Sequence, residues 1–198
     1  TLALLNEMGV ADWNPVSTDF VHGVTEALKL AFADREAYYG DPDFVKVPLK
    51  QLLSREYNQE RSKEISDRAS LELRPGKISG FEVRMPEFDS SGRGDERFSA
   101  MGIGEPTVSK KGETRGDTCH VDVVDRWGNM VSATPSGGWL QSSPVIPELG
   151  FCLNSRAQMF WLQEGLPATL APGKRPRTTL TPSMALRDGK GYLAYGLS

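Results

Sequence analysis

A segment rich in glycine and proline, from residue 73 to residue 117, divides this chain into two halves of different character. Apolar residues recur at helical spacing before it, and they alternate as in strands after it. A long segment of this composition is typical of an extended connection or a disordered strap. Because helices come first and strands second, the order predicts an α+β fold rather than a repeat or a doubly wound sheet.

Two helical patterns lie near the N-terminus. Residues 1–8 are typical of the end of a helix, which Gly9 closes. A cap among residues 17–19 begins a second helix that runs to about Tyr39, with apolar residues recurring on one face. This second pattern is the clearest helix in the sequence.

A further helix is predicted to begin at Pro48, which suits the first turn because it has no backbone donor to satisfy. Its apolar side would consist of Leu49, Leu52, Leu53 and Tyr57. The charged run from residue 60 to residue 68 is then most simply a solvated face of this helix.

The half after residue 118 predicts two β-hairpins. Residues 119–124 and 130–133 flank a five-residue turn that contains glycine and asparagine. Residues 184–186 and 192–195 flank a second glycine-containing turn. The residues that follow Thr118 alternate in the period-2 way that suits a half-buried strand.

Less regular structure is expected between the hairpins. Residues 134–149 are rich in glycine, serine and proline and are predicted to form a loop. Residues 151–153 are predicted to form a short strand. Residues 157–164 carry several large apolar side chains and are predicted to form a short helix.

Composition narrows the possible partners. A formal net charge of −3 over 198 residues argues against a nucleic-acid partner. No apolar run approaches the ~20 residues needed for a membrane span. Cys119 and Cys152 are expected to be buried thiols. Since His22 and His120 are the only imidazoles, no metal or cofactor is predicted.

Because the chain begins at Thr1, we interpret it as an internal fragment. Its compartment stays open between cytoplasmic and periplasmic or secreted.

Thr118 stands where the strand-like half begins and allows two interpretations. Its hydroxyl can belong to an ordinary strand residue, since threonine is common in strands. It can also be the nucleophile of an enzyme that frees this residue as a new N-terminus, whose α-amine then serves as the base. A Cys119–His120 thiolate pair is excluded, because adjacent residues of a strand point to opposite faces, whereas Thr118 and His120 share a face.

Four motifs follow one another along the chain: Gly-Asp-Pro-Asp-Phe at residues 40–44, Thr-Cys-His at 118–120, the turn at 125–129, and Lys-Arg-Pro followed by paired hydroxyls and a proline at 174–182. In this order and spacing they resemble the motifs of the γ-glutamyltransferases, also called γ-glutamyltranspeptidases. The resemblance covers nearly the whole chain. It implies an N-terminal nucleophile hydrolase with a four-layer αββα fold, of which this chain holds an incomplete part.

The resemblance also implies a proenzyme that cuts itself between Asp117 and Thr118. Residues 1–117 would then be the C-terminal part of the large subunit, with helices followed by a flexible tail. Residues 118–198 would be the N-terminal, β-rich part of the small subunit. The implied protein partners are therefore the two subunits of one precursor.

The mechanism that the resemblance implies is covalent. Thr118 Oγ attacks a γ-glutamyl amide, for example in glutathione, and the freed α-amine relays the proton. Water or an acceptor amine then resolves the acyl-enzyme. Ser136 is implied to support the nucleophile, while Thr178 and Thr179 are implied to hold the substrate's α-carboxylate. The family's paired oxyanion glycines would follow Ser198, so we expect this chain alone to be inactive.

Three positions depart from the family pattern. The family recognises the α-ammonium of the glutamyl group with carboxylate and amide oxygens, and this sequence has Gly138, Arg156 and Met159 there. Since Arg156 would repel an ammonium, one hypothesis is a substrate without it, such as an oxamate-type or glutaryl-type amide that Arg156 helps to bind. The alternative is that the alignment slips here and that Arg156 is a surface residue.

Two rival functions remain open. The first is an acylase or amidohydrolase of the same fold that acts on amides other than γ-glutamyl ones. The second is a relative that stays uncut and serves as a binding or structural protein. Substrate profiling tests the first alternative, and denaturing electrophoresis of the full-length protein tests the second.

Overall fold

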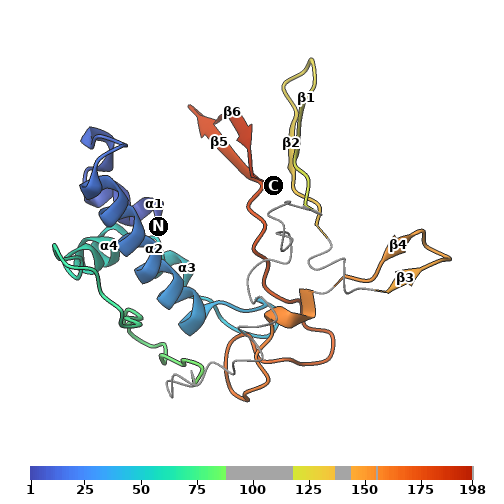
Figure 1. The fold of residues 1–198 in the computed structure, drawn as a ribbon, viewed down its shortest axis with the longest axis horizontal. Coiled ribbons are helices and arrows are strands. Elements are labelled where there is room, and N and C mark those ends of the chain that lie inside the picture. The colour runs from blue at the N-terminus through green and yellow to red at the C-terminus, as the bar shows by residue number, and fades with distance from the viewer. Residues whose placement is uncertain (88–117, 137–143, 155, 198) are drawn as a thin grey trace, which may run out of the picture. The chain divides into compact units, whose positions relative to one another are not determined.

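The computed structural model describes residues 1–87, 118–136, 144–154 and 156–197. The chain divides into two compact units: unit 1 consists of Thr1–Glu87 and Phe160–Pro176, and unit 2 consists of Phe88–Met159 and Arg177–Ser198. In the described residues, unit 1 holds the α-helices and unit 2 holds the β-hairpins (Figure 1). The α+β composition agrees with the prediction. Unit 1 takes residues from both sides of the predicted cleavage point, which itself stays a prediction.

Unit 1 begins with α1 (Leu2–Glu7), η1 (Val10–Asp12) and the long helix α2 (Thr18–Tyr38). The chain leaves α1 as predicted, with Gly9 in the left-handed region at φ 71°. The side chain of Ser17 caps α2 by accepting a hydrogen bond from the Phe20 amide at 3.1 Å. Both predicted N-terminal helices are therefore confirmed.

The apolar stripe of α2 forms the core of unit 1. Ala27 and Leu30 are fully buried and pack with Leu4 and Leu5 of α1. A second cluster, near the C-terminal end of α2, consists of Ala37, Tyr38, Leu52 and Ile78. The buried face of α2 also holds the charged residues Glu26 and Asp34, so the spacing of the apolar residues alone does not define which face of this helix is buried.

The helix predicted from Pro48 is wrong as a single element. The structure has two short helices instead, α3 (Leu49–Leu52) and α4 (Arg55–Ser62). Ser54 is the N-cap of α4, and its hydroxyl accepts a hydrogen bond from the Tyr57 amide at 3.3 Å. A serine that caps a new helix in this way competes with continuation of the preceding one, and this explains the break.

The predicted solvated face is wrong at Arg61, which is buried. Its guanidinium donates to the Asp34 carboxylate of α2 at 3.2 Å. Asp34 also accepts hydrogen bonds from the Tyr57 hydroxyl at 2.9 Å and from the Gly76 amide at 2.7 Å. This network ties residues 73–87, which have no regular secondary structure, to α2.

We expect Asp34→Ala to destabilise the protein by about 3–5 kcal/mol. The substitution leaves the buried Arg61 guanidinium without its carboxylate and removes the acceptor of the Gly76 amide. Urea unfolding followed by circular dichroism measures the loss. Asp67→Ala, at an exposed position, is the control and should leave the urea midpoint unchanged. Equal shifts for the two variants would contradict the role of Asp34.

An ion pair between Asp41 and Arg175 joins two of the motifs that carry the family resemblance. The Asp41 carboxylate, whose side chain is 1% exposed, accepts hydrogen bonds from Arg175 N at 2.8 Å, Nε at 3.0 Å and Nη2 at 2.6 Å. Arg175 Nη2 also donates to Asp43 at 2.6 Å. Gly40 permits close approach here, since a Cβ on it would lie 2.1 Å from the Pro167 carbonyl oxygen. The two motifs thus meet within unit 1.

We expect Asp41→Asn to lower stability at neutral pH. We also expect the variant to lose less stability than wild type when the pH falls. Hydrogen bonds from Arg175 hold the pKa of Asp41 well below its usual range. Such a carboxylate stabilises the fold above its unfolded pKa of about 4, and the contribution is lost as the pH falls further. Between about pH 5 and about pH 3, the urea midpoint of wild type should therefore fall more than that of Asp41→Asn. Parallel curves for the two proteins would contradict this, and Asp67→Asn should follow wild type.

Unit 2 contains both predicted hairpins. Its strands β1 (Val121–Val124) and β2 (Met130–Ala133) pair antiparallel, as do β5 (Ser183–Arg187) and β6 (Lys190–Tyr195). In the first turn, the Asp125 carboxylate accepts hydrogen bonds from the amides of Trp127 and Asn129, both at 2.9 Å. In the second turn, Asp188 and Gly189 have positive φ angles of 52° and 74°, as a two-residue type I′ turn requires. Both hairpin predictions are confirmed.

The stretch between the hairpins differs from the prediction in two places. The predicted loop contains β3 (Val145–Ile146), which pairs with the expected short strand, β4 (Phe151–Cys152). The predicted helix at residues 157–164 is wrong, because the chain forms the 3-10 turn η3 (Arg156–Met159) and then continues irregularly. Trp161 leaves the helical path to pair with Thr169 and to donate its ring N–H to Glu36 at 3.1 Å.

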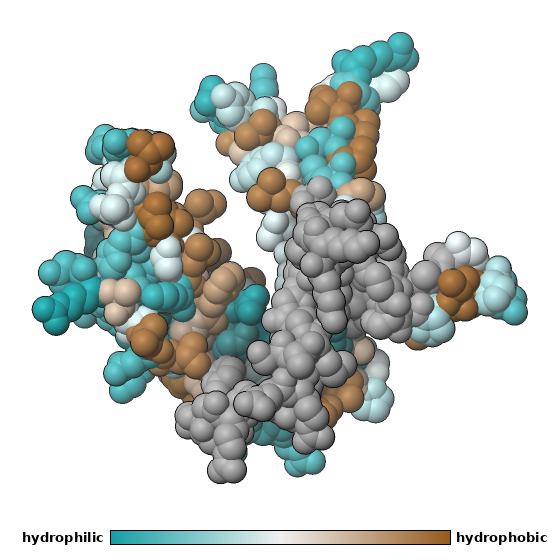
Figure 2. All heavy atoms as spheres, viewed as in Figure 1, coloured by the Kyte–Doolittle hydropathy of each residue, from teal (hydrophilic) through white to brown (hydrophobic). Residues whose placement is uncertain are grey.

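Large apolar side chains stay exposed in both units (Figure 2). On α2, Val21, Leu28 and Phe32 recur at helical spacing outside the buried stripe. On the hairpins, Val123 and Leu186 are more than half exposed, at 54% and 68%. The described residues supply no layer over these side chains. The predicted four-layer arrangement would cover such surfaces, and it stays a prediction.

Candidate active site

The first hairpin brings Thr118 and Ser136 opposite each other. Pairing continues beyond the ends of β1 and β2, since the Cys119 amide donates to the Pro135 carbonyl at 3.2 Å. One step further along, Thr118 Oγ1 donates a hydrogen bond to Ser136 Oγ at 2.9 Å. The two hydroxyls predicted as nucleophile and support are therefore in contact, and both residues are partly buried.

Arg156 extends this contact to a third hydroxyl. It lies at the start of η3, and its Nη2 donates to Ser136 Oγ at 3.1 Å. Its Nη1 donates to Thr179 Oγ1 at 3.0 Å. The guanidinium thus bridges Ser136 and Thr179, and four of the predicted site residues form one hydrogen-bonded chain.

The donor and acceptor of each hydrogen bond determine which chemistry these side chains can support. Thr118 acts as the donor to Ser136, so the lone pairs of its oxygen point away from that bond. Ser136 accepts from both Thr118 and the cationic Arg156. A charged donor strengthens a hydrogen-bonded network and favours negative charge nearby. The arrangement can therefore hold a hydroxyl nucleophile and stabilise an anionic group beside it.

The other residues predicted for the site either lie apart from these hydrogen-bonded side chains or fall outside the described residues. Thr178 is exposed, and its hydroxyl accepts a hydrogen bond from the Leu180 amide at 3.1 Å. Met159 shares η3 with Arg156 and is partly buried. Asp117, on the other side of the predicted cut, and Gly138 lie outside the described residues.

A second polar group on the first hairpin was not predicted as part of the site. His120 Nδ1 lies 2.7 Å from Thr134 Oγ1, and His120 Nε2 lies 2.9 Å from Asp122 Oδ2. Desolvation raises the pKa of Asp122, but the neighbouring Ser132 and His120 side chains outweigh it and hold that pKa below its usual range. The period-2 spacing of Thr118, His120 and Asp122 was the signal in the sequence.

The expectation of buried thiols is wrong for Cys119, which is free and exposed. It follows Thr118 in an extended strand end, so its side chain points to the opposite face of the hairpin. In the described part of the chain, no group of three or more His, Cys, Asp or Glu side chains is placed to hold a metal ion. Within the same residues, none of the helices combines the length and the apolar character needed to cross a membrane.

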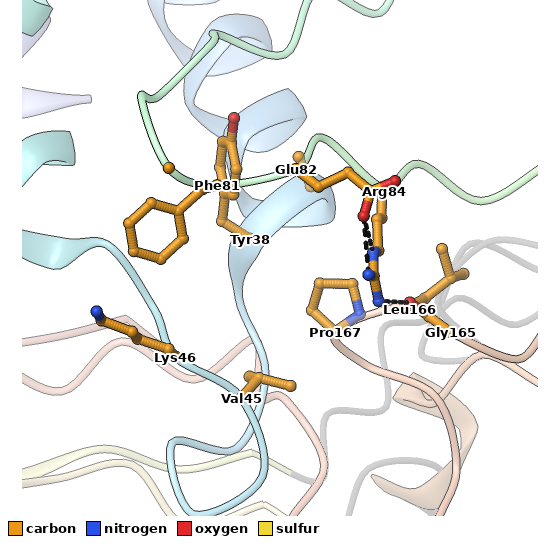
Figure 3. Close-up of a pocket in the computed structure, with 11 residues that line it drawn as sticks. Tyr38, Val45, Lys46, Phe81, Glu82, Arg84, Gly165, Leu166 and Pro167 are labelled. Atoms are coloured by element: carbon orange, nitrogen blue, oxygen red, sulfur yellow. Dashed lines mark hydrogen bonds and ion pairs between the residues drawn. The ribbon is translucent and has the colours of Figure 1, made fainter.

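A pocket of about 440 Å³ lies in unit 1 (Figure 3). Its lining includes Tyr38, Phe81 and Pro167, and Arg84 closes one side by bonding to Glu82 and to the Gly165 carbonyl. None of the residues predicted to be catalytic or substrate-binding lines it. The candidate active site is therefore the hydroxyl chain of unit 2 and not this pocket.

Comparison with known proteins gives a family match along the entire chain. Residues 1–198 match the family model described as Gamma-glutamyltranspeptidase. The Acylase ACY 1 proenzyme of Pseudomonas sp. (strain SE83) is 35% identical over 91% of this chain and 27% of that protein. The Glutathione hydrolase proenzyme of Bacillus subtilis subsp. natto is 29% identical over 98% of this chain and 31% of that protein.

Solved structures give the same result. A structure titled LmbA2991HD matches with a TM-score of 0.70 and 50% identity, over 97% of this chain and 31% of that one. The crystal structure of cephalosporin acylase from Bacillus halodurans matches with a TM-score of 0.61 and 25% identity, over 98% of this chain and 30% of that one. This chain therefore spans less than a third of the length of these relatives.

The resemblance seen in the four sequence motifs is thus confirmed. The match is continuous across both units and includes the hairpin that carries Thr118. We conclude that this chain belongs to the gamma-glutamyltranspeptidase family.

Proposed function

We propose that this chain is part of a self-processing amide hydrolase and acyltransferase in which Thr118 is the nucleophile. The observation that supports it most directly is the 2.9 Å hydrogen bond between Thr118 and Ser136, the two residues that the family resemblance implies as nucleophile and support. The names of relatives, hydrolase and acylase proenzymes, agree with this reaction class. The proposal requires no cofactor.

In the proposed reaction, the precursor first cuts itself between Asp117 and Thr118, which frees the α-amine of Thr118. Thr118 Oγ1 then attacks the amide carbonyl of the substrate while the α-amine accepts the hydroxyl proton. The C–N bond of the amide breaks, and the leaving amine takes the proton. Water or an acceptor amine attacks the resulting ester and releases the acyl group, which returns Thr118 to its starting state.

Two acyl groups are candidates for this reaction. A γ-glutamyl group, as in glutathione, is supported by the relatives named glutathione hydrolase. An acyl group with a carboxylate but no α-ammonium, such as a glutaryl or oxamate type, is supported by acylase relatives and by the position of Arg156. A guanidinium one hydrogen bond away from Ser136 attracts a carboxylate and repels an ammonium. The site therefore favours the second candidate.

Cleavage would leave two chains that share unit 1. Arg175 belongs to the downstream product and Asp41 to the upstream product, and their ion pair holds these segments together. Arg84 of the upstream product also donates to the Gly165 carbonyl at 3.0 Å. We therefore infer that the large and small subunits of the precursor stay associated after the cut.

Denaturing electrophoresis of the full-length protein tests the proposal at its first step. Two chains, with Thr118 at the N-terminus of the smaller one by sequencing, are the expected result. A single chain that persists under active conditions would contradict self-processing. It would support the alternative of an uncut protein with a binding or structural role.

A further inference from the structure

The first hairpin carries a row of polar cross-strand pairs on the face that holds Thr118. The register pairs Asp122 with Ser132 and continues to the contact between Cys119 and Pro135. Counting along this register, the polar pairs are Thr118 with Ser136, His120 with Thr134, and Asp122 with Ser132. These positions alternate with hydrogen-bonded backbone pairs, and side chains approach more closely at such positions. His120 and Thr134 therefore form the step next to Thr118 and Ser136.

The two strand ends near Thr118 share few backbone hydrogen bonds. β1 begins at Val121 and β2 ends at Ala133, so the residues around Thr118 lie beyond the regular ladder. Pro135 accepts a hydrogen bond from the Cys119 amide, but a proline has no N–H with which to return one. One of the two bonds that an antiparallel pair normally exchanges is thus missing beside the proposed nucleophile.

A side-chain bond takes the place of that missing ladder bond. His120 Nδ1 and Thr134 Oγ1 lie 2.7 Å apart, and Thr134 is 6% exposed. His120 Nε2 is held at the same time by Asp122 Oδ2, at 2.9 Å. Because both ring nitrogens are engaged, the imidazole cannot turn without losing two hydrogen bonds.

The third side of the imidazole is closed by Gly196, just after β6. A Cβ on Gly196 would lie 2.4 Å from His120 Cε1 and 2.6 Å from its Nδ1, so only glycine leaves room for the ring. The Ser132 hydroxyl donates to the Tyr195 carbonyl at 3.2 Å and keeps the end of β6 against this hairpin. The ring of His120 is therefore fixed by three elements of unit 2.

We propose that His120 is a positioning residue for Thr118, and that it acts through its cross-strand bond to Thr134. The bond fixes the separation of the two strand ends and thereby keeps Thr118 Oγ1 against Ser136. His120 itself transfers no proton in this role. The inference rests on the proposed function, since it concerns the geometry of the same nucleophile.

Amide replacements of His120 in the full-length protein separate its two bonds. The side-chain nitrogen of asparagine stands near the place of Nδ1, whereas that of glutamine stands near the place of Nε2. His120→Gln and Thr134→Val are expected to lower kcat by about 10- to 100-fold with little change in KM, because a misplaced nucleophile slows the chemical step. His120→Asn, which retains the partner of Thr134, should recover most of the lost kcat. Equal losses for the asparagine and glutamine variants would overturn the proposal.

A double-mutant cycle tests whether His120 and Thr134 act as one unit. The His120→Gln/Thr134→Val protein should be no slower than the slower single variant, whereas multiplying losses would overturn the proposal. Val123→Thr, on the opposite face of the hairpin, controls for general damage and should keep wild-type kcat.

Thr118→Ala distinguishes failure of the proposed function from failure of the proposed role of His120. If Thr118→Ala keeps turnover, the proposed function fails; if it is inactive while His120→Gln has wild-type kcat, only the role of His120 fails.

Discussion

The full-length protein with Thr118→Ala is expected to remain one uncut chain and to lose amide turnover by about 10⁴-fold or more. Alanine removes the oxygen that would attack both the peptide bond before residue 118 and the substrate carbonyl. It also removes the donor of the 2.9 Å hydrogen bond to Ser136. Electrophoresis reads the first loss, and release of p-nitroaniline from an acyl-p-nitroanilide reads the second.

The two losses can be measured separately. A specific protease site inserted between residues 88 and 117 of Thr118→Ala would yield two chains without self-cleavage. These chains are expected to stay inactive, since they still lack the nucleophile. Thr118→Ser keeps a hydroxyl and is the matched control, which should still cut and turn over at a reduced rate. Turnover by the protease-cut alanine variant would exclude Thr118 as nucleophile.

The elements of this chain differ in how far local sequence determined them. The existence of α2 was predictable because Ser17 caps it and apolar residues recur at helical spacing along it, although its buried face also holds Glu26 and Asp34. The break between α3 and α4 was not, since Ser54 suits both a helix surface and an N-cap. The burial of Arg61 was also missed, because its partner Asp34 lies on another helix. A charged residue shows its pairing only once the packing of helices is known.

The candidate site shows the same division. A hairpin with a five-residue turn already pairs Thr118 with Ser136, because fixed register and period 2 place both on one face. The contacts of His120 with Thr134 and Asp122 could have been derived from the same count, which had already placed His120 on the face of Thr118. The bonds from Arg156 to Ser136 and Thr179 could not be derived, since irregular chain separates these residues and no periodicity relates them. The family resemblance identified Arg156 as a departure from the family pattern. Its contacts with Ser136 and Thr179 became known only from the structure.

Replacing Arg156 by glutamine is expected to change the preference between two substrates that differ in one group. Glutaryl-p-nitroanilide and γ-glutamyl-p-nitroanilide share the reacting amide and the distal carboxylate, and only the second has an α-ammonium. Wild type should favour the glutaryl compound, since the Arg156 guanidinium attracts its carboxylate without meeting an ammonium. Arg156→Gln should lower kcat/KM for the glutaryl compound by about 10- to 100-fold, the worth of a charge-assisted hydrogen bond of about 1.5–3 kcal/mol.

The ratio of the two substrates makes this prediction independent of how well the variant processes itself. Poor self-cleavage or poor folding lowers turnover of both compounds equally, because both need the same Thr118. Loss of the guanidinium instead lowers glutaryl turnover and spares γ-glutamyl turnover, since the repulsion of the ammonium disappears together with the attraction of the carboxylate. Arg187→Gln, whose guanidinium lies over the Tyr192 ring at 3.6 Å, changes the same charge elsewhere in unit 2 and should keep the wild-type ratio. Preference of wild type for the γ-glutamyl compound would contradict an ammonium-free substrate, and an unchanged ratio in Arg156→Gln would show that Arg156 does not contact the acyl group.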